Sequence, residues 1–401
     1  MSGDAEVMDW ARDWDHTNPE WVNDPYPIFD ELRDRCPVAH TNRFNNGVWL
    51  PLSFKGVEQV LKDATTFSSD HDGIQKEGYG RPRLPPIHTD PPDHREFRRI
   101  LLPEFTPSAA ANLRDWTRSY CDGLASELEG RSRCDASVDF AQHVPVAVMA
   151  RILGVPIEDG GKFRSWIKQV IELGPNDPTI SNRAFGELAD YMSQVLDVVP
   201  PAVSAVVDRI RDGAQGGSPL DRDEQVRMLM LLVIAGVDTV WNTLGAALWH
   251  LSTHPSDRER LVQAPDLIPD AVEEFLRLYA PVSVPRRALA DAEVEGQAIA
   301  TGDMLLVCVP AANRDSQAFE DANQFKVDRS PNRHLAFGLG IHRCLGSNLA
   351  RMELQVALEA WLAAIPNFSL EPAAEVSWSG GVVRGPKSVP LLIGMAGEGG
   401  M

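Results

Sequence analysis

The chain has 401 residues, of which 57 are acidic and 38 are basic, so its formal net charge is −19. An acidic chain lacks the basic face that nucleic-acid binders use, which argues against that class of function. No apolar run approaches the ~18 residues of a membrane span, and the N-terminus carries acidic residues and tryptophan where a signal peptide has a basic start, so we expect a cytoplasmic protein with no membrane contact.

The first hundred residues predict short elements. After a loosely ordered segment at 1–23, they are a helix at 28–35, two strands at 38–41 and 48–50 around an Asn-Asn-Gly turn, and a helix from Ser53, its cap, to about Lys62. Residues 68–88 are rich in Gly, Pro, His and Asp and predict a long loop, which is usually functional or mobile. The sequence Asp90-Pro91-Pro92-Asp93 then opens another helix.

Helical patterns dominate from about 106 to 265, with breaks at 173–183 and 212–219. The longest predicted helix starts at Asp221, where Asp221 and Glu224 resemble a capping box, and runs to about Ser252. In its middle, residues 235–239 (AGVDT) place a small residue, an acid and a hydroxyl after a long apolar run. A threonine there can bond to the carbonyl of the preceding turn and make room for water, although one polar turn in an amphipathic helix gives the same pattern.

After Pro281 the pattern changes to short β-like pieces at 292–299 and 304–309, a last helix after Cys344 and a β-rich tail at 375–394. Helix outweighs strand, and the elements do not alternate as strand, helix, strand, so a Rossmann sheet is disfavoured. The sequence therefore predicts a mainly α fold with small β regions.

One cysteine stands apart from the other four. The chain has five cysteines and no Cys-x-x-Cys pair, which disfavours zinc, iron–sulfur and disulfide frameworks. Cys344 lies in FGLGIHRCLG at 337–346, whose glycines allow the backbone to approach a flat group closely. We expect Cys344 to open a helix whose dipole favours the thiolate. A buried, inert cysteine is the alternative, but a thiolate that leaves a glycine-lined turn suits the axial position of a metal.

The pattern F-G-x-G-x-H-x-C-x-G resembles the haem-ligand loop of the cytochrome P450 family. The resemblance extends from about Asp24 to Ile393 and is strongest to soluble bacterial members of the camphor-hydroxylase type. It implies a single cytochrome P450 domain at 24–401 that binds haem b, with Cys344 as the axial ligand of the iron. Thiolate ligation donates electron density that favours cleavage of the O–O bond.

The resemblance assigns further roles. Glu274, Arg277 and Arg329 would form a buried charge network that fixes the haem loop. Residues 235–239 fit the pattern A-G-x-D-T, which is similar to the oxygen-binding groove of the family. In that groove, Thr239 would hydrogen-bond dioxygen and Asp238 would relay protons from solvent. The residues implied in haem binding are His94, Arg98, Arg286 and His342 for the propionates, with Arg287 as an alternative to Arg286, and Phe337, Gly338, Gly346 and Ala235 around the ring.

The substrate and the partners are also implied by family position. The loop 68–88, the helices around 165–195 and six apolar residues would line the substrate pocket. These residues are Leu231, Ile234, Val282, Val284, Val382 and Val383. Their apolar character predicts an apolar organic substrate. The electron donor would be a separate ferredoxin, docked by basic residues near Cys344. The candidates for this docking are Arg95, Arg99, Arg343 and Arg351.

The sequence thus predicts a haem-thiolate monooxygenase that takes electrons from ferredoxin and a ferredoxin reductase, and inserts one oxygen atom from dioxygen into a C–H bond. Two alternatives stay open. The first is an enzyme of the same fold that uses peroxide, or that couples or rearranges its substrate. The second is a haem-thiolate sensor or carrier without turnover. The intact Asp238-Thr239 pair favours dioxygen chemistry.

Overall fold

The computed structural model describes residues 7–44, 47–71, 73–74, 82–175 and 177–394. The α-helices are α1 Trp10–Asp13, α2 Pro19–Asn23, α3 Tyr26–Arg35, α4 Phe54–Lys62, α5 Asp93–Leu101, α6 Pro107–Leu128, α7 His143–Leu153, α8 Gly160–Ile167, α9 Pro178–Val198, α10 Ala205–Arg211, α11 Arg222–Thr253, α12 Pro255–Gln263, α13 Ile268–Leu278, α14 Val309–Ala312 and α15 Ser347–Ala364. The strands are β1 Val38–Thr41, β2 Val48–Pro51, β3 Phe67–Ser68, β4 Arg133–Asp135, β5 Ala214–Gln215, β6 Ser218–Pro219, β7 Val284–Ala288, β8 Ala292–Val294, β9 Gln297–Ile299, β10 Met304–Val307, β11 Phe368–Leu370 and β12 Pro390–Ile393.

Short turns of other helix types complete the chain. The 3₁₀ turns are η1 Leu102–Phe105, η3 Ile157–Asp159, η5 Pro265–Leu267 and η6 Gly340–His342, and the π-helical turns are η2 Ala136–Ala141 and η4 Lys168–Leu173. The fold is mainly helical with small sheets, as the composition of predicted elements indicated.

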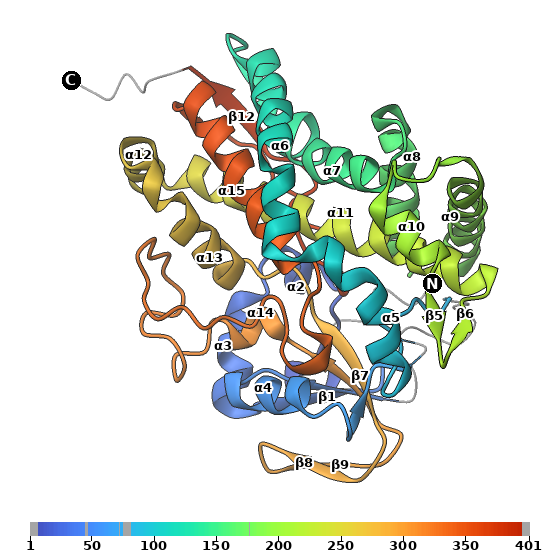
Figure 1. Cartoon of the computed structure of the whole chain (residues 1–401). Helices are drawn as coiled ribbons and strands as arrows, with labels where there is room; N and C mark the ends of the chain where they lie inside the picture. The colour runs from blue at the N-terminus through green and yellow to red at the C-terminus, as the bar shows by residue number, and fades with distance from the viewer. Residues whose placement is uncertain (1–6, 45–46, 72, 75–81, 176, 395–401) are drawn as a thin grey trace.

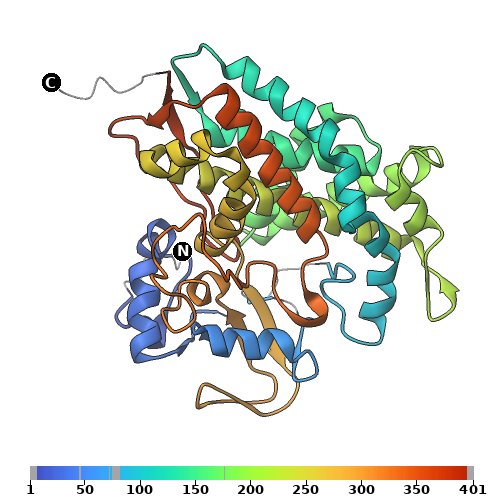
Figure 2. The same cartoon turned by 60° about the vertical axis from the view of Figure 1, so that its left-hand side comes forward.

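The helical layer is built around α11, which passes through the middle of the molecule (Figures 1 and 2). Asp221 caps this helix in a complete capping box with Glu224, as predicted. The helix is long and apolar enough to cross a membrane by composition, but 78% of its most apolar window is buried inside the protein. It packs against α7, α9 and α15, and it is the core helix of the largest hydrophobic cluster.

The second layer is a five-stranded sheet in the order β1-β2-β10-β7-β3. Strands β1 and β2 form the predicted antiparallel pair, β10 runs parallel to β2, and β7 joins antiparallel to β10 and β3. The sheet lies with α3 and α4 in the lower half of Figure 1, beneath the helical layer. Strands β11, β12 and β4 form a separate sheet, and β5-β6 and β8-β9 are hairpins.

In the first half of the chain, most predicted elements are present. Ser53 accepts a hydrogen bond from Gly56 N–H (3.0 Å) and caps α4 as predicted. Residues 10–23, within the segment expected to be loosely ordered, form α1 and α2. The predicted Asn-Asn-Gly turn and loop 68–88 lie partly outside the described residues, which exclude 45–46, 72 and 75–81.

Of three further predictions, those for 173–183 and 375–394 were wrong in their extent, and the break in helix at 212–219 is confirmed. The break at 173–183 is shorter than expected, because Asp177 caps α9 and Pro178 occupies its first turn, where proline is tolerated. The break at 212–219 contains the hairpin β5-β6. The tail at 375–394 is regular only in β12, and before it the chain forms two isolated bridges, Val282 with Val383 and Trp378 with Pro386.

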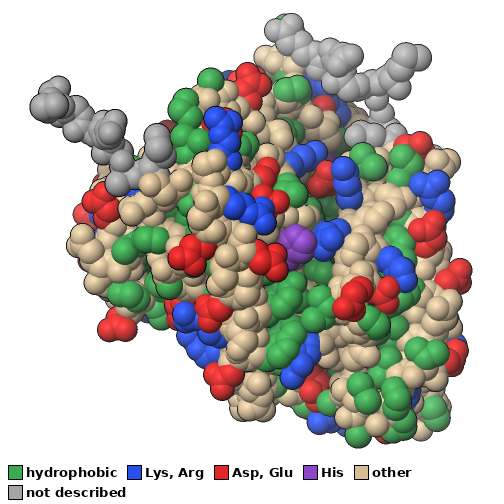
Figure 3. All heavy atoms as spheres, turned by 90° about the horizontal axis from the view of Figure 1, so that it is seen from above, with side chains coloured by type: hydrophobic (Ala, Val, Ile, Leu, Met, Phe, Trp, Pro, Cys, Tyr) green, Lys and Arg blue, Asp and Glu red, His purple; other side chains and the backbone are tan. Residues whose placement is uncertain are grey.

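The surface carries charges of both signs despite the acidic composition. Figure 3 shows acidic and basic side chains interspersed on the face seen from above, with apolar side chains between them. Many of the charges elsewhere are paired within one helix, as in Arg118 with Asp122 and Lys62 with Glu58. Exposed pairs of this kind contribute little to stability.

Candidate functional site

The cysteine loop at 337–346 is a tight turn that contains η6. Cys344 N–H donates to the carbonyl of Phe337 (2.7 Å), which closes the loop. Gly338 and Gly340 have φ of +63° and +69°, a region that favours glycine. A Cβ on Gly340 would lie 2.8 Å from the carbonyl oxygen of Leu61, so the loop can pack against α4 only with glycine at this position.

Cys344 was expected to open a helix, and this was wrong by three residues. The helix α15 begins at Ser347, and Gly346 is its cap. The Cys344 side chain is accessible within an otherwise protein-lined site. Burial raises the pKa of the Cys344 thiol, against the opposing effect of the Gly346 N–H and of nearby arginines, including Arg98. The Gly346 N–H and the arginines favour the thiolate, but the effect of burial on the pKa is larger.

Four basic side chains gather beside the cysteine loop. The ring of His94, from α5, lies 4.3 Å from the ring of His342. Arg98 donates to the carbonyl of Arg343 (2.7 Å), one residue before Cys344. Arg286 is buried on β7, and burial lowers its pKa to about 10. The structure thus brings together His94, Arg98, Arg286 and His342, which come from three distant segments.

This basic cluster is well placed to receive an anion. Burial, followed by the charges of Arg286, His94 and Arg98, lowers the pKa of His342 to about 3, so this imidazole is neutral. Its buried Nε2 has no hydrogen-bond partner among the described residues. A carboxylate bound here would offset the repulsion between the positive charges of the cluster and would give His342 Nε2 a polar partner.

Two details of this cluster go beyond the sequence prediction. The charge of Arg286, but not that of Arg287, contributes to the lowered pKa of His342, which favours Arg286 over its neighbour. His71 also acts on His342, and sequence reasoning missed it. Its ring hydrogen-bonds Pro285 O (3.1 Å) and Gly73 N (3.0 Å). The sequence feature that could have indicated His71 is its position in the loop rich in Gly, Pro and His.

Glu274, Arg277 and Arg329 form one buried ionic network. Glu274 and Arg277 are fully buried and make a bidentate pair, with both N–O distances 2.8 Å. Arg329 Nε donates to both oxygens of Glu274 (3.0 and 3.1 Å). Backbone Lys326 N and Asn332 Nδ2 also donate to this carboxylate. The network therefore ties α13 to the chain segment that precedes the cysteine loop.

Asn313 connects this network to the cysteine loop. Its carbonyl accepts from Arg277 (2.8 Å), and its side-chain Oδ1 accepts from the N–H of Leu335 (2.7 Å). Leu335 in turn accepts from Gly338 N–H (2.8 Å), inside the loop. A continuous chain of hydrogen bonds therefore connects the buried charges to the cysteine loop.

The middle of α11 combines an accessible residue with a buried acid. Ala235 is exposed although the preceding turns of the helix are buried. Thr239 Oγ1 donates to Ala235 O (3.0 Å), the bond to the preceding turn that the sequence predicted. Asp238 is 5% exposed, and its Oδ2 has no hydrogen-bond partner among the described residues. A carboxyl oxygen without a partner is chemically suited to hold or release a proton.

Burial, and then the negative charge of Glu172, raise the pKa of Asp238 to about 7. Glu172 itself is paired with Lys387 (3.3 Å). We expect the C=O band of the protonated Asp238 carboxyl in difference infrared spectra to disappear as the pH is raised, with a midpoint near pH 7. Glu172→Gln lowers that midpoint because it removes a like charge. The band is identified by its loss in Asp238→Asn, and a midpoint below about 5 would contradict the assignment.

The predicted pocket residues come from separate parts of the core. Leu231 and Ile234 belong to the main cluster around α11, Val382 borders a second cluster, and Val284 borders a third. Val282 and Val383 are joined by an isolated bridge. This distribution fits residues that line a space between clusters, and their role stays a prediction.

The four candidate docking arginines differ in their contacts. Arg351 is held by Glu273 through two hydrogen bonds (2.6 and 2.8 Å), and its guanidinium lies over the ring of Phe337 (4.4 Å). It therefore supports the cysteine loop from within the protein. Arg95, Arg99 and Arg343 are exposed. These three remain candidates for a partner surface.

The chain is similar to known proteins over most of its length. The family model described as Cytochrome P450 matches residues 266–379. The chain is 32% identical to the mycinamicin IV hydroxylase/epoxidase of Micromonospora griseorubida, with 91% of this chain and 94% of that protein covered. It is also 32% identical to the vitamin D(3) 25-hydroxylase of Pseudonocardia autotrophica, with 93% and 94% covered. The solved structure of the cytochrome P450 PksS from Bacillus subtilis superposes with a TM-score of 0.86 at 29% identity, covering 95% of this chain and 99% of that one.

Proposed function

The chain belongs to the cytochrome P450 family and is a cytochrome P450 monooxygenase, and on this premise we propose that it hydroxylates a small to medium-sized apolar organic substrate, terpenoid or aromatic-like, with electrons from a separate ferredoxin and ferredoxin reductase. The hydroxylase names of two relatives support C–H oxidation. The apolar side chains proposed for the pocket support an apolar substrate. We propose the cytoplasm as its location.

The family implies a haem-iron cofactor, and the residues of this chain fit haem b. The unpartnered Nε2 of His342 lies within a basic cluster that suits two propionates. A Cβ on Gly338 or Gly346 would meet nothing within 4 Å, which leaves open space beside the loop. We assign Cys344 as the iron ligand, and Phe337, Gly338, Gly346 and Ala235 as neighbours of the ring. When bound, a haem with a thiolate ligand supplies the electron density that favours O–O cleavage.

The acid–hydroxyl pair carries the proposal of dioxygen chemistry. Because the Thr239 hydroxyl gives its proton to Ala235 O, its lone pairs face outward and can accept a hydrogen bond from water or from a protonated acid. With a pKa of about 7, Asp238 can both hold and release a proton near neutral pH. Together they deliver protons at the accessible turn of α11.

Two alternatives lose support at this pair. An enzyme that uses peroxide or couples its substrate has no need of a proton relay, and a sensor or carrier has no need of a substrate pocket. Screening terpenoid, aromatic and fatty ligands for a haem spin-state shift identifies a substrate. We then expect that substrate to accelerate NADH consumption by the ferredoxin-coupled enzyme and to acquire oxygen from ¹⁸O₂. Oxygen incorporation only from added peroxide, or no product at all, would overturn the proposal.

Thr239→Ala tests the relay directly. We expect the variant to retain haem and to consume NADH, but the product formed per NADH should fall about tenfold or more as electrons go to hydrogen peroxide. Thr243→Ala is the matched control, because Thr243 makes the same bond to the preceding turn, at Thr239 O (2.8 Å), but is buried. Unchanged coupling in Thr239→Ala would remove this residue from the mechanism.

A further inference from the structure

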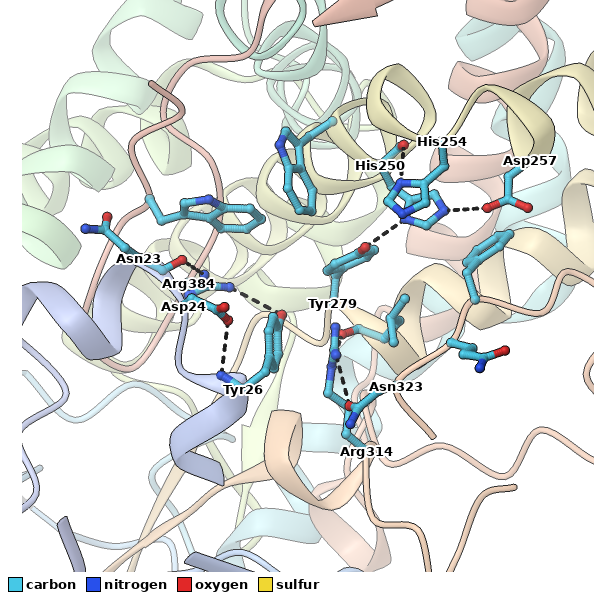
Figure 4. Close-up of a pocket in the computed structure, with 15 residues that line it drawn as sticks. Asn23, Asp24, Tyr26, His250, His254, Asp257, Tyr279, Arg314, Asn323 and Arg384 are labelled. Atoms are coloured by element: carbon cyan, nitrogen blue, oxygen red, sulfur yellow. Dashed lines mark hydrogen bonds and ion pairs between the residues drawn. The ribbon is translucent and has the colours of Figure 1, made fainter. Parts of the chain in front are cut away.

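A second cavity lies apart from the cysteine loop and the basic cluster. Its volume is about 530 Å³, within the range of ~300–1,000 Å³ found for small-molecule sites. It opens between the start of α3, the junction of α11 and α12, the end of α13 and the segment 378–384 (Figure 4). None of the residues proposed for haem or proton transfer lines it.

Two arginines form one wall of this cavity. Arg314 is 6% exposed, and its guanidinium stacks on the ring of Tyr26, with Cζ 3.4 Å from the centroid. Its Nε donates to Leu278 O (3.0 Å), and one terminal nitrogen donates to Asn323 Oδ1 (3.2 Å). These acceptors are uncharged, and they use two of the five N–H groups of the guanidinium.

Arg384 approaches the same tyrosine from another side. It donates to Val22 O (3.0 Å), to Asn23 O (2.8 Å) and to the hydroxyl of Tyr26 (3.3 Å). Burial lowers its pKa, the charges of Tyr26 and Asp24 oppose this shift, and the charge of Arg314 adds to it. In the described part of the chain, neither arginine forms an ion pair with a carboxylate. The two guanidiniums over the Tyr26 ring therefore have no direct carboxylate partner and retain spare donors.

The remaining walls are mostly aromatic. Trp249 and Trp378 meet edge to face, with centroids 5.2 Å apart, and Trp249 also packs against Tyr279. The Arg384 guanidinium lies over Trp378 (4.0 Å). These surfaces can receive a flat apolar body next to the cationic wall.

Two acids border the cavity but do not neutralise the arginines. Asp24 is exposed, and its carboxylate accepts from Tyr26 N–H (3.3 Å). The Asp257 carboxylate and His250 Nε2 form a hydrogen bond (3.0 Å). Figure 4 shows Asp257 beyond His250 and His254, away from Arg384. His250 is occupied on its other nitrogen by the Tyr279 hydroxyl (2.7 Å). Asp24 acts on Arg384 through its charge, but neither acid forms a direct ion pair with the arginine wall.

From this arrangement we propose that the cavity is a second binding site, for a small aromatic carboxylate. The carboxylate group binds the spare N–H groups of Arg314 and Arg384, and the aromatic ring lies against Trp249 and Trp378. Guanidinium forks match carboxylate geometry, and pairing offsets the cost of holding two like charges side by side. The inference is independent of the substrate that the haem site oxidises.

The probe for this site is 2-naphthoate, with the uncharged 2-naphthamide as its matched partner. Binding to the holoenzyme is measured by calorimetry while an excess of an azole inhibitor fills the haem site. We expect the acid to bind at least tenfold more tightly than the amide. Equal affinities, or binding of neither compound at millimolar concentration, would overturn the proposal, and this comparison needs no variant.

Arg384→Gln locates the site. The variant should bind 2-naphthoate at least tenfold more weakly while retaining its haem spectrum. Arg133→Gln is the control, because Arg133 is an exposed arginine paired with Glu371 on another face of the chain and should leave the affinity unchanged. If folded Arg384→Gln binds the acid as the wild type does, the ligand lies elsewhere and the assignment fails.

Discussion

Replacing Cys344 by alanine will abolish product formation while leaving the fold in place. The side chain is small and accessible, and the loop closes through its backbone N–H to Phe337 O, a bond that alanine retains. The change therefore removes the sulfur and little else. The expected result is a protein with native circular dichroism and no hydroxylated product. The measurement is product formation per enzyme in the ferredoxin-coupled assay.

Cys36→Ala is the matched control for this variant. Cys36 is a half-buried thiol that packs against the second hydrophobic cluster, and its sulfur donates a hydrogen bond to Val38 O (3.4 Å). It should retain full activity. Substantial turnover by Cys344→Ala would show that the sulfur at this position does not hold the iron.

Glu274→Gln should cause the largest loss of stability of any conservative substitution in the chain. The side chain keeps its shape but loses the charge that Arg277 and Arg329 share. Removing one member of a buried ionic network leaves uncompensated charge, which costs about 3–5 kcal/mol. We expect a lower urea midpoint of unfolding and weaker haem retention, because the network is bonded through Asn313 to the cysteine loop.

The neighbouring acid provides the comparison. Glu273 pairs with Arg351 on the partly exposed side of α13, where both side chains are about a quarter exposed. Burial acts to raise the pKa of Glu273, but the hydrogen bonds from Arg351 and His334 prevail and lower the pKa to about 2. Glu273→Gln should cost about 1 kcal/mol. Equal losses of stability in Glu274→Gln and Glu273→Gln would contradict the claim that the buried network contributes more than the partly exposed pair.

Local signals predicted much of this structure. The Asp221–Glu224 box located the start of α11, Ser53 located the start of α4, and the two short runs at 38–41 and 48–50 around an Asn-Asn-Gly sequence predicted the β1-β2 pair. Each of these depends on residues within a few positions of one another. The cysteine loop and the Glu274–Arg277 spacing were equally local, and their family resemblance supplied the partners that lie far along the chain.

The errors arose where distant contacts decide the outcome. β7 was missed because Val284–Ala288 contains a proline and two arginines, and it becomes a strand only by pairing with β10 and β3. The pairing of Arg351 with Glu273 was not predicted, because the two residues lie 78 positions apart in the chain. Pro178 read as a helix breaker, although Asp177 makes it a helix start. The pKa of Asp238 depends on burial and on Glu172, neither of which the local sequence reveals.

The ligand of the iron is the central claim, and the ferrous–carbonyl absorption spectrum of the purified wild-type holoprotein tests it most directly. If Cys344 holds the iron through its sulfur, the ferrous–carbonyl form would show the red-shifted Soret band of a thiolate-ligated haem. A band typical of nitrogen ligation, in protein that is fully folded and loaded with haem, would contradict the assignment and the oxygen chemistry that depends on it.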